Sequence, residues 1–171
     1  MEGRNKLAVY PLERDDLAAT AGARLSALGV RLAVVETTAG GLISARLVSV
    51  PGASTWFERG VTAYSRASKL DVSPEVERIL TAHGAVSREL VAALAGAMRT
   101  RSGVEYALAE SGIAGPQDGR RSSKAAGTAV IGLATPSGTR IEEHAFAGSR
   151  AAIMVQVSDR ALRLLVEALD E

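Results

Sequence analysis

The sequence predicts a single three-layer α/β/α domain with a mixed, mostly parallel sheet that ends in a hairpin. Short β-type apolar runs alternate along the chain with longer stretches whose apolar residues recur at helical spacing, which is typical of α/β domains. Two late strand-like runs are separated only by the turn sequence at 136–139, which predicts an antiparallel hairpin. Within 171 residues there is no internal repeat and no linker long enough to divide two domains.

The first half of the chain is expected to alternate helices and strands. Apolar residues at helical spacing predict a helix within 12–28 that stops at Gly29. An apolar run predicts a strand at 31–36, and a helical pattern follows from about 40 to 49. The next elements expected are a short helix at 53–57, a strand at 60–65, a connector at 69–72 and a helix at 74–82.

The second half is expected to complete the sheet and close the domain. A capped start at Ser87 predicts a helix at 87–102, and a third strand is expected at 106–111. The elements expected after it are a polar loop at 117–126, hairpin strands at 127–135 and 140–146, and a last helix at 149–169. Residues 1–10 are expected to be an N-terminal tail, and the domain is assigned to 11–171.

Composition and charge exclude several classes of function. Twenty basic residues against 19 acidic ones give a net charge of +1 with no long basic block, so direct nucleic-acid binding is not expected. The chain has no Cys, and His83 and His144 lie far apart without ligand spacing, so we expect no metal site. The charged N-terminus and the absence of any apolar run of about 18 residues predict a cytoplasmic protein without membrane contact.

The stretch from 33 to 42 carries the most chemical information. An apolar strand ends there in Thr37 and Thr38, and Gly40 and Gly41 lead into a helix. Backbone N–H groups beside hydroxyl oxygens at such a helix start suit an anion or a developing negative charge. The alternative is that a threonine only caps the helix while the glycines allow a tight turn.

Hydroxyl and small residues also end two other expected strands. These are Tyr64-Ser65 and Ser111-Gly112, and the carboxyl ends of strands in α/β folds converge on one pocket. Lys69 follows Tyr64 closely, and a lysine whose pKa is lowered by burial could serve as a base for a hydroxyl nucleophile. The alternatives are a half-buried strand aromatic at Tyr64 and a solvated amine at Lys69.

Three further features lie near these strand ends. Residues 112–116 could bring backbone N–H groups to a ligand, as a phosphate cradle or an oxyanion hole, or could form an ordinary turn. Glu110 ends an otherwise apolar strand, where it either faces a pocket or pairs with an arginine. Arg150, near the start of the last helix, either holds a phosphate or caps a local carboxylate.

Motifs in a fixed order connect these residues to a known family. The motifs are Glu36-Thr37-Thr38-Ala39-Gly40-Gly41, Pro51-Gly52-Ala53-Ser54 with Trp56-Phe57, Gly60-Val61-Thr62-Ala63-Tyr64-Ser65 with Lys69, His83-Gly84-Ala85-Val86-Ser87, Ser111-Gly112-Ile113-Ala114-Gly115-Pro116, Gly127-Thr128, and Phe146-Ala147-Gly148-Ser149-Arg150. From about residue 12 to residue 169, the chain resembles the C-terminal domain of the CinA (competence/damage-inducible) proteins, which also occurs alone as nicotinamide-mononucleotide amidohydrolase.

The resemblance implies an α/β/α domain that hydrolyses the carboxamide of nicotinamide mononucleotide to nicotinate mononucleotide and ammonia, in pyridine-nucleotide salvage. By this resemblance the catalytic residues are Thr37, at the position of the family's nucleophilic serine, with Tyr64 and Lys69 assisting it. The implied partner is a small nucleotide substrate, and the chemistry needs neither a metal nor a cofactor. The expected substrate-binding residues are Thr38, Gly40, Gly41, Ser111, Gly112, Ala114, Gly115 and Arg150.

The chain departs from the family pattern at several positions. Thr37 replaces the nucleophilic serine and Ala39 replaces the motif's threonine, so a second interpretation is a catalytically impaired relative that binds a nucleotide as a sensor or partner module. Arg66 replaces a usual asparagine and Glu110 a usual apolar residue, and these two could reshape substrate choice or pair with each other. The loop at 117–126 lacks the family's Gly-Gly pair and Lys-Pro.

Two further expectations concern partners. The apolar residues of the helix at 87–102 could support a homodimer, which is the commonest assembly of soluble domains. A DNA-associated competence function rests only on the name of the family, and the near-neutral charge of the chain argues against it.

Overall fold

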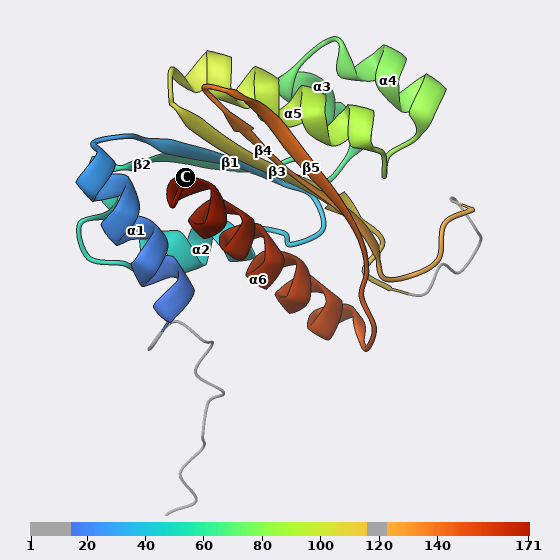
Figure 1. Ribbon diagram of the computed structural model, residues 1–171. Coiled ribbons are helices and arrows are strands. Elements are labelled where there is room, and N and C mark those ends of the chain that lie inside the picture. Colours follow the sequence, from blue (N-terminus) through green and yellow to red (C-terminus); the bar gives the residue numbers. More distant parts are fainter. Residues whose placement is uncertain (1–14, 116–122) are drawn as a thin grey trace, which may run out of the picture.

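A five-stranded sheet in the order β2-β1-β3-β4-β5 forms the middle of three layers (Figure 1). The computed structural model describes residues 15–115 and 123–171. The strands are β1 (Leu32–Glu36), β2 (Phe57–Thr62), β3 (Tyr106–Gly112), β4 (Thr128–Thr135) and β5 (Gly138–Ala145). β1 pairs in parallel with β2 and β3, and only β4 runs against its neighbours, β3 and β5. This confirms the predicted α/β class with a mixed, mostly parallel sheet and a terminal hairpin.

Helices cover both faces of the sheet (Figure 1). One face carries α1 (Asp16–Leu28), α2 (Leu42–Val48) and α6 (Arg150–Leu169). The other face carries α3 (Arg66–Val72), α4 (Val76–His83) and α5 (Arg88–Ser102). A short 3-10 turn, η1 (Ala53–Thr55), leads into β2.

Alternation along the central strands decides which side chains meet which helix layer. Val34 on β1 and Leu108 on β3 point into the core beneath α6. Their neighbours along each strand point toward α5; these are Ala33, Val35, Ala107 and Ala109. Glu36 and Glu110 lie two residues beyond Val34 and Leu108, so they point to the α6 side as well. Both glutamates are fully buried, and they become important at the site.

The order of the strands reverses at β1. From β1 the chain runs through α2 to β2 on one side, and it then returns through α3, α4 and α5 on the opposite face to β3 on the other side. The carboxyl ends of β1 and β3 therefore flank a topological switch point. In open α/β sheets this is the place where ligands bind.

Two elements differ from the sequence prediction. The predicted connector at 69–72 is the second half of α3, because Ser65 and Ser68 form a reciprocal capping box that begins a helix just before it. The predicted strand at 60–65 is displaced, because pairing of β2 with β1 already starts at Phe57. The other predicted helices and strands are confirmed, with small shifts at their ends.

Two of the sequence predictions concern residues outside the described part of the chain. The expected tail at 1–10 lies wholly outside it, and so do positions 117–122 of the polar loop. The first described helix, α1, ends as predicted at Gly29, which adopts a left-handed conformation with φ of 64°.

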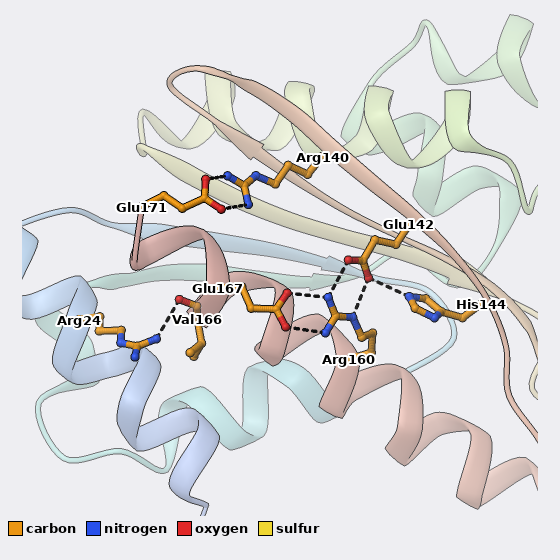
Figure 2. A network of polar contacts seen from close by, with 8 residues as sticks. All are labelled: Arg24, Arg140, Glu142, His144, Arg160, Val166, Glu167 and Glu171. Carbon is orange, nitrogen blue, oxygen red and sulfur yellow. Dashed lines mark hydrogen bonds and ion pairs between the residues drawn. The ribbon is translucent and has the colours of Figure 1, made fainter.

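A network of charged side chains attaches α6 to β5 (Figure 2). Arg160 donates to both carboxylate oxygens of Glu142, at 2.7 and 2.6 Å, and to both of Glu167, at 2.8 and 2.7 Å. His144 Nε2 lies 2.8 Å from Glu142 Oε2. The hydrogen bonds from Arg160 lower the pKa of Glu142 to about 2. The network fixes the long helix α6, whose first residue, Arg150, reaches the candidate site.

Candidate functional site

A cavity of about 600 Å³ opens at the switch point, beyond the carboxyl ends of β1 and β3. It brings together the end of β1, the segment from Tyr64 into α3, the end of β3 and the first residue of α6. The predicted site residues that line it are Thr37, Thr38, Tyr64, Lys69, Ser111, Gly112, Ala114, Gly115 and Arg150. Gly40 and Gly41 do not line the cavity.

The turn that follows β1 is held by the carboxylate of Glu36. Glu36 Oε2 accepts hydrogen bonds from the backbone N–H groups of Gly41 and Ile43, both at 2.9 Å. Glu36 Oε1 accepts from the backbone N–H of Ser44 at 2.8 Å and from its hydroxyl at 2.6 Å. One buried carboxylate thus satisfies the N–H groups at the start of α2, which a short helix would otherwise leave without partners.

A second buried carboxylate, that of Glu110, holds the residues that directly precede this helix start. Glu110 Oε1 accepts hydrogen bonds from the backbone N–H groups of Thr37 at 2.6 Å, Thr38 at 2.7 Å and Ala39 at 2.9 Å. Burial raises the pKa of Glu110 to about 7, although the N–H groups of Ala39 and Thr37 and the side chain of Thr38 favour the charged form. Glu110 therefore holds the Thr37–Ala39 turn through its backbone N–H groups.

This corrects two expectations about charged residues near the site. Glu110 is not among the residues that line the cavity, and its hydrogen-bond partners are backbone N–H groups rather than an arginine. Arg66 does not pair with Glu110 either, because its guanidinium binds Glu77 on α4 at 2.5 Å.

The anion expected at this turn is supplied by the protein itself. Backbone N–H groups from both halves of the turn point at the carboxylates of Glu36 and Glu110 rather than into the cavity. Gly40 and Gly41 allow this wrapping, because both have positive φ, of 68° and 102°. These glycines therefore shape the turn that presents the threonines and take no part in the cavity wall.

Thr37 and Thr38 both line the cavity. Both are nearly buried, with exposed fractions of 4% and 6%, and their Oγ1 atoms lie 3.5 Å apart. Within the described residues, no hydrogen bond joins Thr37 to Lys69. The two side chains nevertheless line the same cavity.

Lys69 is a buried amine, with an exposed fraction of 5%. Its Nζ donates to the carbonyl oxygens of Ala63 at 2.9 Å and of Tyr64 at 2.8 Å. Burial lowers the pKa of Lys69, and the negative charge of Glu110 opposes this effect. The alternative that Lys69 is a solvated amine is therefore wrong.

The phenol of Tyr64 forms its hydrogen bond with Arg150 and not with the amine of Lys69. Tyr64 is 65% exposed, and its hydroxyl accepts from Arg150 Nη2 at 3.1 Å. Arg150 also packs against Gly115, where an added Cβ would lie only 3.2 Å from Arg150 Nη1. Tyr64, Arg150 and Gly115 thus form one wall of the cavity.

Sequence reasoning gave no site role to other residues that line the cavity. His83 and Val86 are among them, and Lys124 also lines the cavity. Ser111 Oγ donates to the carbonyl of Ala85 at 2.5 Å, and Lys124 Nζ donates to that of Val86 at 2.5 Å, so the segment between α4 and α5 forms an opposite wall. The sequence feature that could have pointed to this wall is the motif at 83–87, which connects α4 and α5.

The charge of the cavity wall is one-sided. Lys69, Lys124 and Arg150 line it, whereas no Asp or Glu is among its lining residues within the described part of the chain. Over residues 15–115 and 123–171, no group of three or more His, Asp or Glu side chains is placed to hold a metal ion. The cavity therefore suits an anionic organic ligand.

Known proteins with similar sequences include CinA-like proteins of several bacteria. A family model described as the CinA C-terminal domain matches residues 14–169. A CinA-like protein of Anaeromyxobacter sp. (strain K) is 39% identical over 161 residues, which are 94% of this chain and 39% of that protein. A CinA-like protein of Frankia casuarinae is 41% identical over 134 residues, which are 78% of this chain and 30% of that protein. The chain thus spans less than half the length of these relatives.

Solved structures with the same fold are matched over nearly their whole length. The competence damage-inducible protein A of Klebsiella pneumoniae superposes with a TM-score of 0.86 at 28% identity, covering 91% of this chain and 96% of that chain. A competence/damage-inducible protein of Agrobacterium tumefaciens superposes with a TM-score of 0.83 at 28% identity, covering 92% of this chain and 98% of that chain. In the described residues, every helix is too short or too polar to span a bilayer. With its sequence matched from 14 to 169 and its fold shared over nine-tenths of its length, the chain belongs to the CinA C-terminal domain family.

Proposed function

We propose that this domain hydrolyses the carboxamide of nicotinamide mononucleotide and forms nicotinate mononucleotide and ammonia. The observation that carries the proposal is the cavity, which Thr37 and the buried Lys69 line together with the cations Lys124 and Arg150. Its volume of about 600 Å³ falls in the range of small-molecule sites. A phosphate group of the substrate would bind well beside the two cations.

In the proposed reaction, the Thr37 hydroxyl attacks the carboxamide carbon and the neutral Lys69 amine accepts its proton. The C–N bond then breaks as Lys69 returns this proton to the departing nitrogen, which leaves as ammonia. Water attacks the remaining ester on Thr37, again with Lys69 as base, and the product carboxylate is released. The lowered pKa of Lys69 supports this role, because it increases the share of neutral amine at a given pH.

The experiment that tests this activity separates substrate from product by charge. Purified protein is incubated with nicotinamide mononucleotide, and the mixture is resolved by anion-exchange chromatography, on which the product elutes later because of its additional carboxylate. We expect nicotinate mononucleotide with the wild-type chain and none above background with Thr37→Ala. Product formed equally by both proteins, or by neither, would contradict hydrolysis by Thr37.

Three features favour a second candidate function, in which the domain binds a nucleotide without hydrolysing it. Thr37 carries a methyl group that crowds its hydroxyl, Ala39 offers no hydroxyl, and Glu110 takes N–H groups that an oxyanion would need. Calorimetric titration with nicotinamide mononucleotide separates the two candidates, since binding without product supports the second. Hydrolysis gained by Thr37→Ser combined with Ala39→Thr would then identify a scaffold whose nucleophile is disabled.

A homodimer in the cytoplasm also belongs to the proposal. The buried apolar residues of α5 pack in the chain's own core, so a dimer would have to use other surfaces. Size-exclusion chromatography with light scattering measures the mass in solution. A mass of twice the chain supports the dimer, and the mass of a single chain contradicts it.

A further inference from the structure

Glu110 takes no part in the reaction written above, yet it lies fully buried beneath the threonines of the site. Its Oε1 accepts all three backbone N–H groups of the Thr37–Ala39 turn, while its Oε2 has no hydrogen-bond partner within the described residues. A buried carboxyl with one oxygen unpaired lowers the stability of a core that an apolar side chain would fill without that cost. Packing alone therefore does not account for a glutamate at position 110.

The surroundings of Glu110 connect it to one cation in particular. Glu36 on β1 and Lys69 on α3 are the charged groups with which it interacts electrostatically. Among the described residues, four further titratable or charged groups line the cavity: Tyr64 before α3, His83 at the end of α4, Lys124 before β4 and Arg150 on α6. Glu36 is held by four hydrogen bonds at the start of α2, and Lys69 is the cation on which the charge of Glu110 acts.

We propose that Glu110 is a positioning residue of this site: its carboxylate holds the Thr37–Ala39 turn in place, and its charge favours the protonated form of Lys69 against the effect of burial. The inference deepens the proposed function and rests on it for the activity readout alone. It assigns a purpose to a carboxylate that neither lines the cavity nor pairs with an arginine.

The sign of the effect follows from the two opposing influences on Lys69. Burial lowers the pKa of Lys69, and an ionised Glu110 raises it. The pKa of Glu110 itself is raised to about 7 by burial, so its charge develops as the pH increases through that value. Lys69 therefore experiences a different field below and above about pH 7, and this coupling is absent when residue 110 is neutral.

The composition of the chain makes the coupling measurable without an enzyme assay. Lys6, Lys69 and Lys124 are its only lysines, so lysine selectively labelled with ¹³C at Cε gives a simple NMR spectrum. Lys69→Arg and Lys124→Arg assign the signals. In the wild-type chain we expect the Lys69 signal to show a second inflection near pH 7, reporting Glu110, and the Lys124 signal serves as the internal control.

Two substitutions separate charge from geometry at residue 110. Glu110→Gln keeps an oxygen that can accept the three N–H groups but removes the charge, so the inflection near pH 7 disappears and Lys69 titrates at lower pH. Glu110→Met removes the acceptor as well, so we expect kcat for nicotinamide mononucleotide to fall about tenfold below that of Glu110→Gln with KM little changed. Glu143→Gln, on the exposed face of β5, is the matched control and leaves the Lys69 signal unchanged.

A Lys69 signal without an inflection near pH 7 in the wild-type chain overturns the proposal, and so does an unchanged Lys69 titration in Glu110→Gln. Circular dichroism shows whether Glu110→Gln and Glu110→Met fold. If neither variant folds, the wild-type titration alone still tests the coupling between Glu110 and Lys69. If the wild-type chain hydrolyses nothing, the NMR measurement still stands. Failure of the proposed function is thus distinguishable from failure of this inference.

Discussion

Thr37 is the residue on which the proposed chemistry depends. It lines the cavity, its hydroxyl lies 3.5 Å from that of Thr38, and the N–H groups of its turn are held by Glu110. A β-branched side chain has few accessible χ1 rotamers, and the methyl group of a threonine stands next to the reacting oxygen. The backbone of the nucleophile is therefore well fixed, while the approach to its oxygen is narrower than for a serine.

The first prediction is that Thr37→Ser increases the rate of hydrolysis of nicotinamide mononucleotide. Removing the methyl group opens the path to the carbonyl carbon, and we expect a gain in kcat of on the order of tenfold. Steady-state measurement of ammonia release determines it. Thr38→Ser makes the same chemical change on the neighbouring residue and should give no such gain. An equal gain from both variants, or a loss from Thr37→Ser, would contradict the role of Thr37.

Glu110 shows how far residue-level prediction from the sequence could go. Its place at the end of an apolar strand marks it as unusual, and alternation along the strand predicts which face it points to. Its partners are backbone N–H groups more than 70 residues away in the chain, and a backbone group has no signature in the sequence. The glutamate could therefore be singled out from the sequence, but its contacts could not.

At the scale of elements, α3 is the helix that the sequence pattern did not predict, and it carries Lys69. The helix has only seven residues, and its capping box uses Ser68 in the position where glutamate or glutamine is the usual signal. The longer helices have clear caps and apolar stripes, and their prediction is confirmed. Short elements are hard to predict because they contain less than two full turns of apolar periodicity.

The second prediction concerns this capping box. Ser65→Ala removes the side-chain oxygen that accepts from the backbone N–H of Ser68 at 3.1 Å, so we expect the free energy of unfolding to fall by about 1 kcal/mol. Because Lys69 lies on the same helix, activity should fall too. Urea denaturation followed by circular dichroism measures the change.

The control for this prediction is Thr100→Ala, which removes an exposed hydroxyl that bonds only within its own helix, to the carbonyl of Gly96. Alanine has the higher helix propensity there, so the control should be neutral or slightly stabilising. Equal destabilisation by both variants would mean that the capping box contributes nothing specific.

At the scale of the whole molecule, the site results from the strand order. Sequence patterns predicted the alternation of helices and strands and the convergence of strand ends, but the central place of β1 comes from pairing with two strands that are distant in sequence. Tyr64 illustrates the difference, since β2 ends at Thr62 and the tyrosine reaches the cavity from the segment that leads into α3. Long-range pairing of this kind is invisible to local periodicity.

The third prediction tests how α6 is attached to the sheet. The pKa of Glu142 is lowered to about 2 by hydrogen bonds from Arg160, so its contribution to stability is present above its usual pKa of 4.5 and is lost as the pH falls toward 2. We expect Glu142→Gln to lower the free energy of unfolding by about 1 kcal/mol at pH 7 and by much less near pH 2. Thermal unfolding at several pH values measures this.

Glu143→Gln is the matched control for that experiment. The neighbouring Glu143 is 52% exposed and lies 3.3 Å from Arg88, and exposed pairs of this kind contribute little. A destabilisation by Glu142→Gln that is independent of pH, or no larger than that of Glu143→Gln, would mean that the network in Figure 2 does not hold α6 through charge.

Hydrolysis by Thr37 and Lys69 in this cavity is tested by one measurement: the rate of ammonia release from nicotinamide mononucleotide against pH, for the wild-type chain and for Lys69→Met. We expect the wild-type rate to rise with pH as Lys69 loses its proton, at a pH below that of an ordinary lysine because burial lowers its pKa. Lys69→Met should be slower by about a hundredfold or more and should lack this rise. A Lys69→Met protein with the rate and pH dependence of the wild type would show that the buried amine is not the base.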